Sequence, residues 1–343
     1  MPRLERKERY TLALVPLSGC GGCEVQALRA IALAPDLQKR YEIVYWPLAV
    51  EATRLPDEVD VALVEGLVRT RENLEALRDI RRRARVLIAL GSCAAWGGIG
   101  GNADSFNHRL SMRAIYGRER IEESAEILPR TFAAADLVPV DYVISRCPPP
   151  VEHIMLTLRA IAEGRPVKVA DSTVCSQCPR KMKPIERLEF KPGLPGPDAD
   201  PETCFLSQGY LCLGSVTTMG CGAPCTRHGI PCFGCGGPHH EIAERRDMDI
   251  ITALARKIAT LAGLDPVKDL DTIVEKLLKV YNPRRFYVFT FASQVLRGKP
   301  HGFAVRALVE SRRDPLLRRR LEERERFARG EAPPPGPAAA GGN

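Results

Sequence analysis

The sequence predicts an α/β fold in which a doubly wound parallel sheet comes first, followed by a loop-rich, cysteine-rich domain and C-terminal helices. Two observations carry this prediction. Short apolar runs alternate with helix-like patterns over about the first 165 residues, as in parallel sheets covered by helices. Six of the 12 cysteines then fall within residues 204–235, where glycines separate them and periodic bulky residues are missing, so neither a helix nor a strand is expected there.

The apolar pattern places the elements of this fold along the chain. Strands are expected at about 9–17, 42–50, 59–68, 85–91 and 138–146. Helices are expected at about 24–34, 71–84 and 151–164, the last of which begins directly after three prolines. Beyond residue 240, helical spacing of apolar residues predicts two further helices at about 246–264 and 270–281.

Four cysteines follow closely after predicted strands, namely Cys20, Cys23, Cys93 and Cys147. Because ligands of doubly wound sheets bind outside the carboxyl ends of the strands, we expect these four thiols to meet at one edge of the sheet. Neighbouring glycines would let the backbone come close to a bulky group there. The alternative is a set of unrelated small buried thiols, which would require the same strand-end placement four times by coincidence.

The other eight cysteines predict further thiolate sites. They are Cys175, Cys178, Cys204, Cys212, Cys221, Cys225, Cys232 and Cys235. The first two and the last two form C-x-x-C pairs, a spacing that lets two sulfurs hold one metal ion or one cluster edge. Eight ligands suffice for two four-ligand sites, but spacing alone leaves their division open.

Composition limits the classes of protein to consider. The chain has 343 residues, of which 45% are hydrophobic and 27% charged, and no apolar run reaches the length of a membrane span. No export signal is recognisable near the N-terminus, so we expect a cytoplasmic location. Disulfides are rare in that compartment, and clustered cysteines there bind metals or catalyse. The net charge of +8 comes largely from arginines, which we interpret as solvated helix faces rather than a polyanion site.

Zinc and iron–sulfur clusters both accept four thiolates, and three features favour clusters. The sheet-edge cysteines come from three separate loops, whereas structural zinc usually takes two close pairs. Glycine-rich loops offer backbone N–H groups that can donate to cluster sulfides. The six histidines form no H-E-x-x-H or Ser/His/Asp pattern, and no phosphate loop is present, so the chain suits electron transfer better than substrate chemistry.

An ordered series of motifs resembles the small subunits of [NiFe] hydrogenases. The similarity is closest to the cytoplasmic, methyl-viologen-reducing type associated with heterodisulfide reductase, and it covers about residues 10–240. The motifs are SGCGGCE (18–24), VDVALVEG (59–66), GSCAAWGG (91–98), CPPP (147–150), CSQCPRK (175–181), QGYLCLG (208–214), GCGAPC (220–225) and PCFGCGGP (231–238). Such a series is highly specific, so the family's fold, activity and ligands become expectations for this chain.

The resemblance implies three [4Fe-4S] clusters and a ligand set for each. It assigns Cys20, Cys23, Cys93 and Cys147 to a proximal cluster, Cys175, Cys178, Cys204 and Cys212 to a distal cluster, and Cys221, Cys225, Cys232 and Cys235 to a medial cluster. Two positions depart from the familiar periplasmic enzymes of the family. Cys175 stands where those enzymes use a histidine ligand, and Cys225 supplies a fourth ligand where they hold a three-iron cluster.

The function that this resemblance implies is electron transfer. We expect electrons to pass from a nickel–iron site on a large subunit, through the clusters, to an acceptor protein, of which a heterodisulfide-reductase-like protein is one candidate. Bond chemistry is expected on the large subunit, so no catalytic residue is predicted in this chain. Glu24, next to Cys23, is a candidate for proton movement, although a charge at a helix N-terminus is the simpler explanation.

Two rival functions remain for comparison. The cluster-bearing subunit of a respiratory-type oxidoreductase would use only the sheet-edge site and would leave eight cysteines unexplained. A zinc-stabilised nucleic-acid-binding protein accounts for cysteine pairs and arginine-rich helices, but aromatic residues make up only 6% of the chain and form no stacking platform. We therefore expect neither a nucleic-acid partner nor a transmembrane segment.

The predicted fold class is thus α/β, with a flavodoxin-like doubly wound parallel sheet followed by a cysteine-rich iron–sulfur domain and C-terminal helices. The predicted domains are a flavodoxin-like domain with the proximal cluster (1–165), a cysteine-rich domain with two clusters (166–240), a helical C-terminal extension (241–330) and a disordered tail (331–343).

Overall fold

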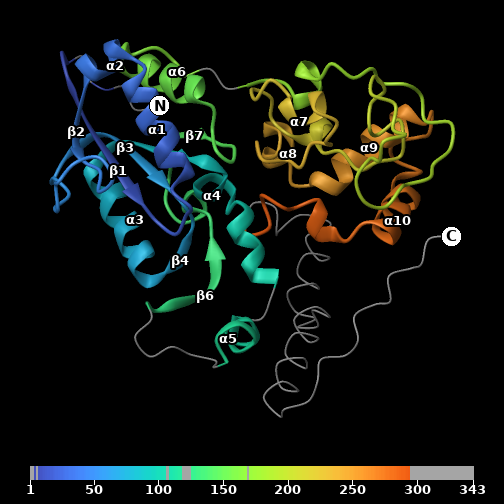
Figure 1. The fold of residues 1–343 in the computed structure, drawn as a ribbon, viewed down its shortest axis with the longest axis horizontal. Coiled ribbons are helices and arrows are strands. Elements are labelled where there is room, and N and C mark those ends of the chain that lie inside the picture. The colour runs from blue at the N-terminus through green and yellow to red at the C-terminus, as the bar shows by residue number, and fades with distance from the viewer. Residues whose placement is uncertain (1–3, 5–6, 106–107, 118–124, 168–169, 294–343) are drawn as a thin grey trace.

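The computed structural model describes residues 4, 7–105, 108–117, 125–167 and 170–293. In Figure 1 these residues form a sheet region, up to residue 167, and a cysteine-rich region, from residue 170, which lie side by side. The predicted tail and the part of the predicted helical extension beyond residue 293 lie outside the described residues. None of the described helices is long and apolar enough to cross a membrane.

A five-stranded parallel sheet forms the centre of the sheet region. Its strands are β1 (Tyr10–Pro16), β2 (Tyr41–Tyr45), β3 (Val59–Glu65), β5 (Ala84–Leu90) and β7 (Tyr142–Ile144). They lie in the order β2-β1-β3-β5-β7, and every neighbouring pair is parallel. Counted along the sheet's own strands, this is the 2-1-3-4-5 order of flavodoxin-like folds, so the predicted fold class is confirmed.

Helices cover both faces of this sheet (Figure 1). They are α1 (Gly22–Ala32), α2 (Pro35–Arg40), α3 (Arg71–Arg83), α4 (Gly91–Trp96) and α6 (Val151–Ala162). A further helix, α5 (His108–Tyr116), lies apart from the sheet, near β6 (Ile127–Phe132). Successive strand residues point to opposite faces, so Leu12 and Leu14 of β1 pack with α1 and α6, whereas Ala13 and Val15 pack with α3 and α4. Burial on both faces explains why these strands read as continuous apolar runs.

Some strands are shorter than the apolar pattern predicts. β2 ends just before Trp46, where the Ala49 N–H donates to the Trp46 carbonyl at 2.9 Å and turns the chain. β3 ends at Glu65, because the next residue, Gly66, has a φ of 84° and cannot continue the strand. The chain then enters a separate antiparallel pair, β4 (Val68–Thr70) with β6 (Ile127–Phe132). The sequence pattern does not predict this pair, because β4 is short and a proline interrupts β6.

The cysteine-rich region has few regular elements and one continuous core. Its described helices are α7 (Pro224–Arg227), α8 (His240–Glu244), α9 (Ile250–Leu261) and α10 (Leu270–Val280). Phe205 and Leu213 from the loops pack with Leu254 of α9 and Leu277 of α10. The two helices predicted after residue 240 are therefore confirmed as α9 and α10. The predicted domain limits stay predictions, although this core runs across the one at residue 240.

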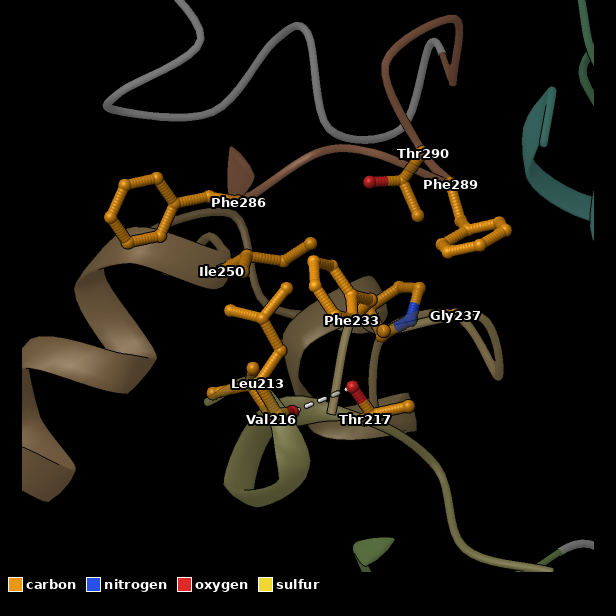
Figure 2. Close-up of a pocket in the computed structure, with 11 residues that line it drawn as sticks. Leu213, Val216, Thr217, Phe233, Gly237, Ile250, Phe286, Phe289 and Thr290 are labelled. Atoms are coloured by element: carbon orange, nitrogen blue, oxygen red, sulfur yellow. Dashed lines mark hydrogen bonds between the residues drawn. The ribbon is translucent and has the colours of Figure 1, made fainter. Parts of the chain in front are cut away.

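A small apolar pocket lies where the last described segment meets the cysteine loops. Figure 2 shows Phe286 and Phe289 approaching Phe233 and Leu213 across this pocket. Thr217 Oγ1 donates to the carbonyl oxygen of Leu213 at 2.6 Å and closes the turn on the other side. Residues far along the chain thus help to fix the loops that contain the cysteines.

Candidate metal centres

The structure brings the four cysteines predicted at the sheet edge together. Cys20 and Cys23 follow β1, Cys93 lies in α4 after β5, and Cys147 follows β7. These strands are parallel, so their carboxyl ends lie at one edge of the sheet. Burial and then the charge of Glu65 raise the pKa of Cys23, and the other three thiols add to this increase. The four sulfurs share one electrostatic environment, the sheet-edge group.

Two glycines leave room for the sulfur atoms of this group. Gly91 has a φ of 83°, and a Cβ at this position would lie 2.3 Å from Sγ of Cys23. Gly98 has a φ of 54°, and its Cβ would lie 2.4 Å from Sγ of Cys93. Side chains essentially never approach so closely, so both positions require glycine.

Two buried carboxylates lie beside the sheet-edge group. Glu65 ends β3 and Glu24 lies in the first turn of α1, and they are 3% and 8% exposed. Trp46 Nε1 donates to Glu24 Oε2 at 2.9 Å. Burial and then the charge of Glu24 raise the pKa of Glu65 to about 7, so this carboxyl can hold a proton near neutral pH. Glu24 is therefore a buried, hydrogen-bonded group, and its part in proton movement stays a prediction.

A second group, the pocket group, comprises Cys175, Cys178, Cys204 and Cys212, which line one cavity. Burial raises the pKa of Cys175 and of Cys212 to about 12. Cys178 Sγ donates to Thr226 Oγ1 at 3.1 Å. The cavity brings the C-x-x-C pair together with Cys204 and Cys212, which follow 26 or more residues later, and these are the four that the resemblance assigns to a distal cluster.

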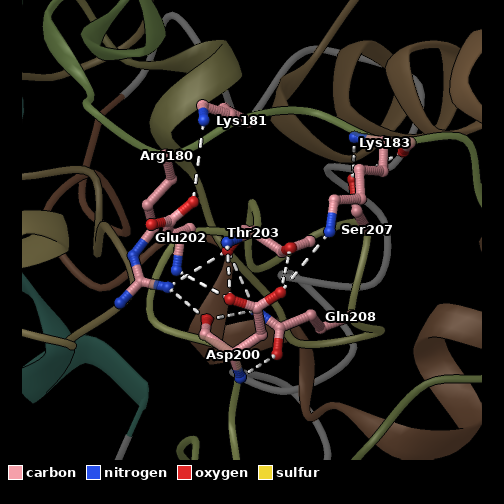
Figure 3. Close-up of polar contacts among 8 residues, drawn as sticks. All are labelled: Arg180, Lys181, Lys183, Asp200, Glu202, Thr203, Ser207 and Gln208. Atoms are coloured by element: carbon pink, nitrogen blue, oxygen red, sulfur yellow. Dashed lines mark hydrogen bonds and ion pairs between the residues drawn. The ribbon is translucent and has the colours of Figure 1, made fainter.

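A polar network fixes the loop just before Cys204 (Figure 3). The Asp200 carboxylate accepts from the backbone N–H of Glu202 at 2.8 Å and from the Thr203 hydroxyl. Arg180 Nη1 donates to the carbonyl oxygens of Asp200 and Thr203 at 2.9 and 3.1 Å. The hydrogen bond from the Thr203 side chain and then that from Glu202 lower the pKa of Asp200 to about 2. The charged carboxylate thus holds Cys204 at the wall of the pocket.

The remaining four cysteines, Cys221, Cys225, Cys232 and Cys235, form the loop group. Burial raises the pKa of Cys235, and thiolate charge at Cys221 and Cys225 raises it further. Cys232 is half-buried, and burial and then the charge of Cys212 raise its pKa, with Cys235 adding to the increase. Cys225 is the exposed member of the group.

Hydrogen bonds connect the three groups in a row. The hydroxyl of Ser92, next to Cys93, donates to the carbonyl oxygen of Cys235 and joins the sheet-edge group to the loop group. The Cys232 N–H donates to Cys212 Sγ at 3.3 Å and joins the loop group to the pocket group. The order is therefore sheet-edge, loop and pocket, as the proximal, medial and distal assignment implies. The assignment of each cysteine to a particular cluster stays a prediction.

The donor sets fit metal centres bound by thiolates. All 12 cysteines are free thiols, and each group offers four sulfurs at glycine-rich turns. Burial holds the pKa of several of them well above neutral, for example to about 11 for Cys93, so metal binding must displace protons. Four thiolates per site suit an iron–sulfur cluster or zinc, and metal analysis distinguishes the two.

Sequence reasoning missed two side chains at the junction of the two regions, one of them fully buried. Arg146, directly before Cys147, is 5% exposed. The Trp96 indole at the end of α4 packs against Gly237, where a Cβ would lie 2.1 Å from Trp96 Nε1. Neither residue has a sequence signal, because an arginine beside a strand is normally solvated and a tryptophan after Cys93 is an ordinary core residue.

Comparisons with known proteins find relatives over most of the chain. A family model described as NADH ubiquinone oxidoreductase, 20 Kd subunit, matches residues 20–161. A subunit of the F420-non-reducing hydrogenase of Methanocaldococcus jannaschii is 33% identical over 234 residues, covering 66% of this chain and 81% of the relative. The delta subunit of sulfhydrogenase 2 from Pyrococcus furiosus is 34% identical over 227 residues, covering 66% and 86%. Among solved structures, an NAD+-reducing [NiFe]-hydrogenase in the H2-reduced state aligns with 27% identity and a TM-score of 0.42, covering 47% of this chain and 94% of that chain.

Proposed function

Because this chain belongs to the small subunits of [NiFe] hydrogenases, in the group of the F420-non-reducing, methyl-viologen-reducing enzymes, we propose that it carries electrons between a nickel–iron large subunit and an acceptor protein. The chain is one subunit of an oxidoreductase. Bond chemistry with hydrogen would take place on the large subunit, and this chain would supply the electron path.

Each of the three thiol groups would hold one [4Fe-4S] cluster. The sheet-edge group would hold the proximal cluster, the loop group the medial cluster and the pocket group the distal cluster. When bound, such clusters take up and release one electron at a time. Four sulfurs gathered at each group support this assignment, and the departures at Cys175 and Cys225 favour four-iron clusters throughout.

The observation that carries the proposal is the row of hydrogen-bonded thiol groups. The Ser92 hydroxyl, beside Cys93, donates to the carbonyl oxygen of Cys235, and the Cys232 N–H donates to Cys212 Sγ of the neighbouring group. Each contact joins the chain at one group to the chain at the next. Metal sites that serve only to stabilise a fold do not have to lie next to one another in a row, whereas electron transfer requires it.

In this proposal, the residues of the chain bind the clusters, shield them from water and set their reduction potentials. Burial of Cys204 and Cys212 excludes water from the pocket group, and Cys232 of the adjoining loop group is half-buried. N–H donors to sulfur stabilise negative charge there and are one means by which proteins set cluster potentials. The raised pKa values of the buried thiols mean that each site releases protons as its centre assembles.

The exposed surface supports two different partners. Cys20 and Cys147 of the sheet-edge group are exposed, and Val25 and Leu28 of the adjacent helix α1 are 52% and 39% exposed. This apolar surface beside the proximal site would receive the large subunit. The pocket group lies at the other end of the row, beside the exposed Met182, and would face the acceptor, for which a heterodisulfide-reductase-like protein is one candidate.

A cytoplasmic location is part of the same proposal. It is supported by the 12 free thiols, which an oxidising compartment would tend to convert to disulfides. Fractionation of the native cells, with immunodetection of the chain, tests it directly. Recovery of the chain in a compartment outside the cytoplasm would overturn this part alone.

Iron, acid-labile sulfide and zinc in protein purified without oxygen test the main proposal. We expect about twelve iron and twelve sulfide per chain, the content of three four-iron clusters. About three zinc without sulfide would overturn the proposal and favour a zinc-stabilised protein. About four iron would favour a respiratory-type subunit, the kind of protein for which the matching family model is described.

Anaerobic co-purification with the tagged chain tests the partners. We expect a nickel-containing large subunit and an additional redox protein to be retained. If instead the chain is recovered alone with three clusters bound, the electron-carrier role stands and the assignment of a stable large-subunit contact beside α1 fails.

A further inference from the structure

Arg146 lies between β7 and Cys147 in a backbone conformation that side chains rarely adopt. Its φ is 109°, in the region that favours glycine. The residue is also 5% exposed. Strained residues persist where the surrounding structure holds them, and they cluster at functional sites. A strained and buried arginine next to a proposed ligand therefore calls for a functional reason.

The guanidinium of Arg146 reaches into the loop group. Its Nη2 donates to the Thr218 carbonyl at 2.8 Å and to the Met219 carbonyl. A Cβ on Gly220 would lie 3.1 Å from Nη2, and one on Gly236 would lie 3.4 Å from Cζ. These glycines adjoin two cysteines of the loop group, so the cation sits between the loops that carry them.

In the described part of the chain, this cation is bonded to carbonyls and not to a carboxylate. Its Nε is buried and has no hydrogen-bond partner there. His153, which also lies against Gly220, cannot be the counter-ion, because an imidazole is either neutral or cationic. A buried charge without a counter-ion is strongly unfavourable. Gly236, the residue after Cys235, faces Cζ of the guanidinium, so the cation lies beside the loop that carries this cysteine.

We propose that Arg146 is the counter-ion of the centre held by the loop group and that it raises the reduction potential of that centre. The inference rests on the proposed function, since it requires a cluster at this group. A [4Fe-4S] core with four thiolate ligands is an anion that becomes more negative on reduction. A fixed cation beside it stabilises the reduced form more than the oxidised form. The unpartnered Nε–H of Arg146 would donate to a sulfur of the centre, which acts in the same direction.

The position of the loop group explains why such a charge matters. Its centre lies between the other two in the row, so its potential decides how easily one electron passes from the sheet-edge group to the pocket group. No bond forms or breaks in this transfer. Arg146 would thus act on the cluster through its charge and would not take part in bond chemistry. Its strained backbone conformation would persist because the loops and the anion hold it in place.

An EPR-monitored redox titration of the anaerobically purified complex tests this role. Arg146→Gln removes the charge at similar length, and we expect it to shift the redox equilibrium of one cluster about tenfold towards the oxidised form, about 59 mV for a one-electron couple. Arg146→Lys keeps the charge and should restore most of the shift. Arg159→Gln is the matched control, because Arg159 pairs with Asp36 at 2.6 Å on the surface, and it should shift no cluster.

Iron and sulfide analysis of each protein separates the possible outcomes. Wild-type protein without three clusters would overturn the proposed function and this inference with it. Three clusters with unchanged potentials in Arg146→Gln would overturn the inference and leave the proposed function intact. Loss of about four iron in Arg146→Gln but not in Arg146→Lys would support it, because assembly would then depend on the charge. The same loss in both variants would overturn it, because the shape of arginine and not its charge would be required.

Discussion

The sheet region and the cysteine-rich region position their thiols by different means. In the sheet region, cysteines follow parallel strands whose hydrogen-bonded registers define where each strand ends. In the described part of the cysteine-rich region, the loops are joined by isolated bridges such as Thr173 with Thr218 and Thr217 with Pro238. Side-chain networks such as that of Asp200 supply the remaining restraints. Regular backbone pairing locates the thiols in one region, and tertiary packing locates them in the other.

This difference indicates where each region obtains its folding free energy. The two cores of the sheet region are built mainly from aliphatic side chains of strands and helices. The core of the cysteine-rich region contains Cys204 and Cys212 of the pocket group, with Cys232 packed against it, whereas a sheet-region core contains Cys23. Where ligand loops lack regular elements, metal-binding free energy is folding free energy. The sheet region should therefore fold without metal, whereas the cysteine-rich region should depend on it.

Removal of the metal centres is the strongest test of this comparison. We expect amide hydrogen exchange in metal-free protein to accelerate at least about a hundredfold, or about 2.7 kcal/mol, across residues 204–216. Exchange across β3 should stay close to that of the metal-loaded protein, because aliphatic side chains make up most of its core, with Cys23 among them. Mass-spectrometric hydrogen exchange on both forms measures this. Equal acceleration in both regions would refute the idea that only one of them depends on metal.

Gly91→Ala tests whether the sheet edge needs close approach of backbone to sulfur. The new Cβ would lie 2.3 Å from Cys23 Sγ, so we expect Cys23 to be displaced and about four iron to be lost. Gly164→Ala is the control, because Gly164 also has a positive φ, 65°, but has open space around it. This control should retain iron and lose only about 1–2 kcal/mol of stability from the backbone conformation. Full iron content in Gly91→Ala would show that the turn can rearrange.

Cys225→Ser tests the exposed edge of the loop group. Because Cys225 is exposed, we expect its loss to remove one iron and leave a three-iron centre, seen by EPR, on the other three ligands. Cys235→Ser is the matched variant. Cys235 is less exposed than Cys225, and a hydrogen bond from the Ser92 hydroxyl to its carbonyl oxygen joins it to the sheet region, so its loss should remove the whole loop-group centre. A three-iron signal in intact wild-type protein would instead show that Cys225 is not a ligand.

The same contrast explains what the sequence could predict. At the sheet edge, apolar strand patterns and cysteines coincide, so both the fold and the meeting of four thiols followed from local signals. In the cysteine-rich region, the network around Asp200 positions Cys204 close to Cys175, and the Cys232 N–H of the loop group donates to Cys212 Sγ of the pocket group. Such partnerships depend on packing between distant segments, so spacing leaves them open. Arg146 lacked any signal because charged residues are normally exposed.

Asp60 allows a finer test that is confined to the sheet region. It is 4% exposed and accepts from Lys7 Nζ at 2.7 Å and from the Thr11 N–H at 3.0 Å. Burial alone would raise the pKa of Asp60. The hydrogen bonds from Lys7 and then Thr11 outweigh burial, so the pKa in the folded protein lies below the ordinary value of 3.8. A carboxyl whose folded pKa is depressed contributes stability above its unfolded pKa. That contribution is lost as pH falls through the folded value.

We therefore expect metal-free protein to lose part of the unfolding free energy of its sheet region as pH falls below about 3.8. Asp60→Asn should weaken that dependence and cost about 1–3 kcal/mol at neutral pH, because charge-assisted hydrogen bonds are lost. Urea unfolding followed by the fluorescence of the buried Trp46 measures both effects. Asp57→Asn is the control, because its carboxylate is fully exposed and should change neither. If Asp60→Asn left the acid dependence unchanged, the strand-to-strand contact at Asp60 would not be what stabilises the metal-independent region.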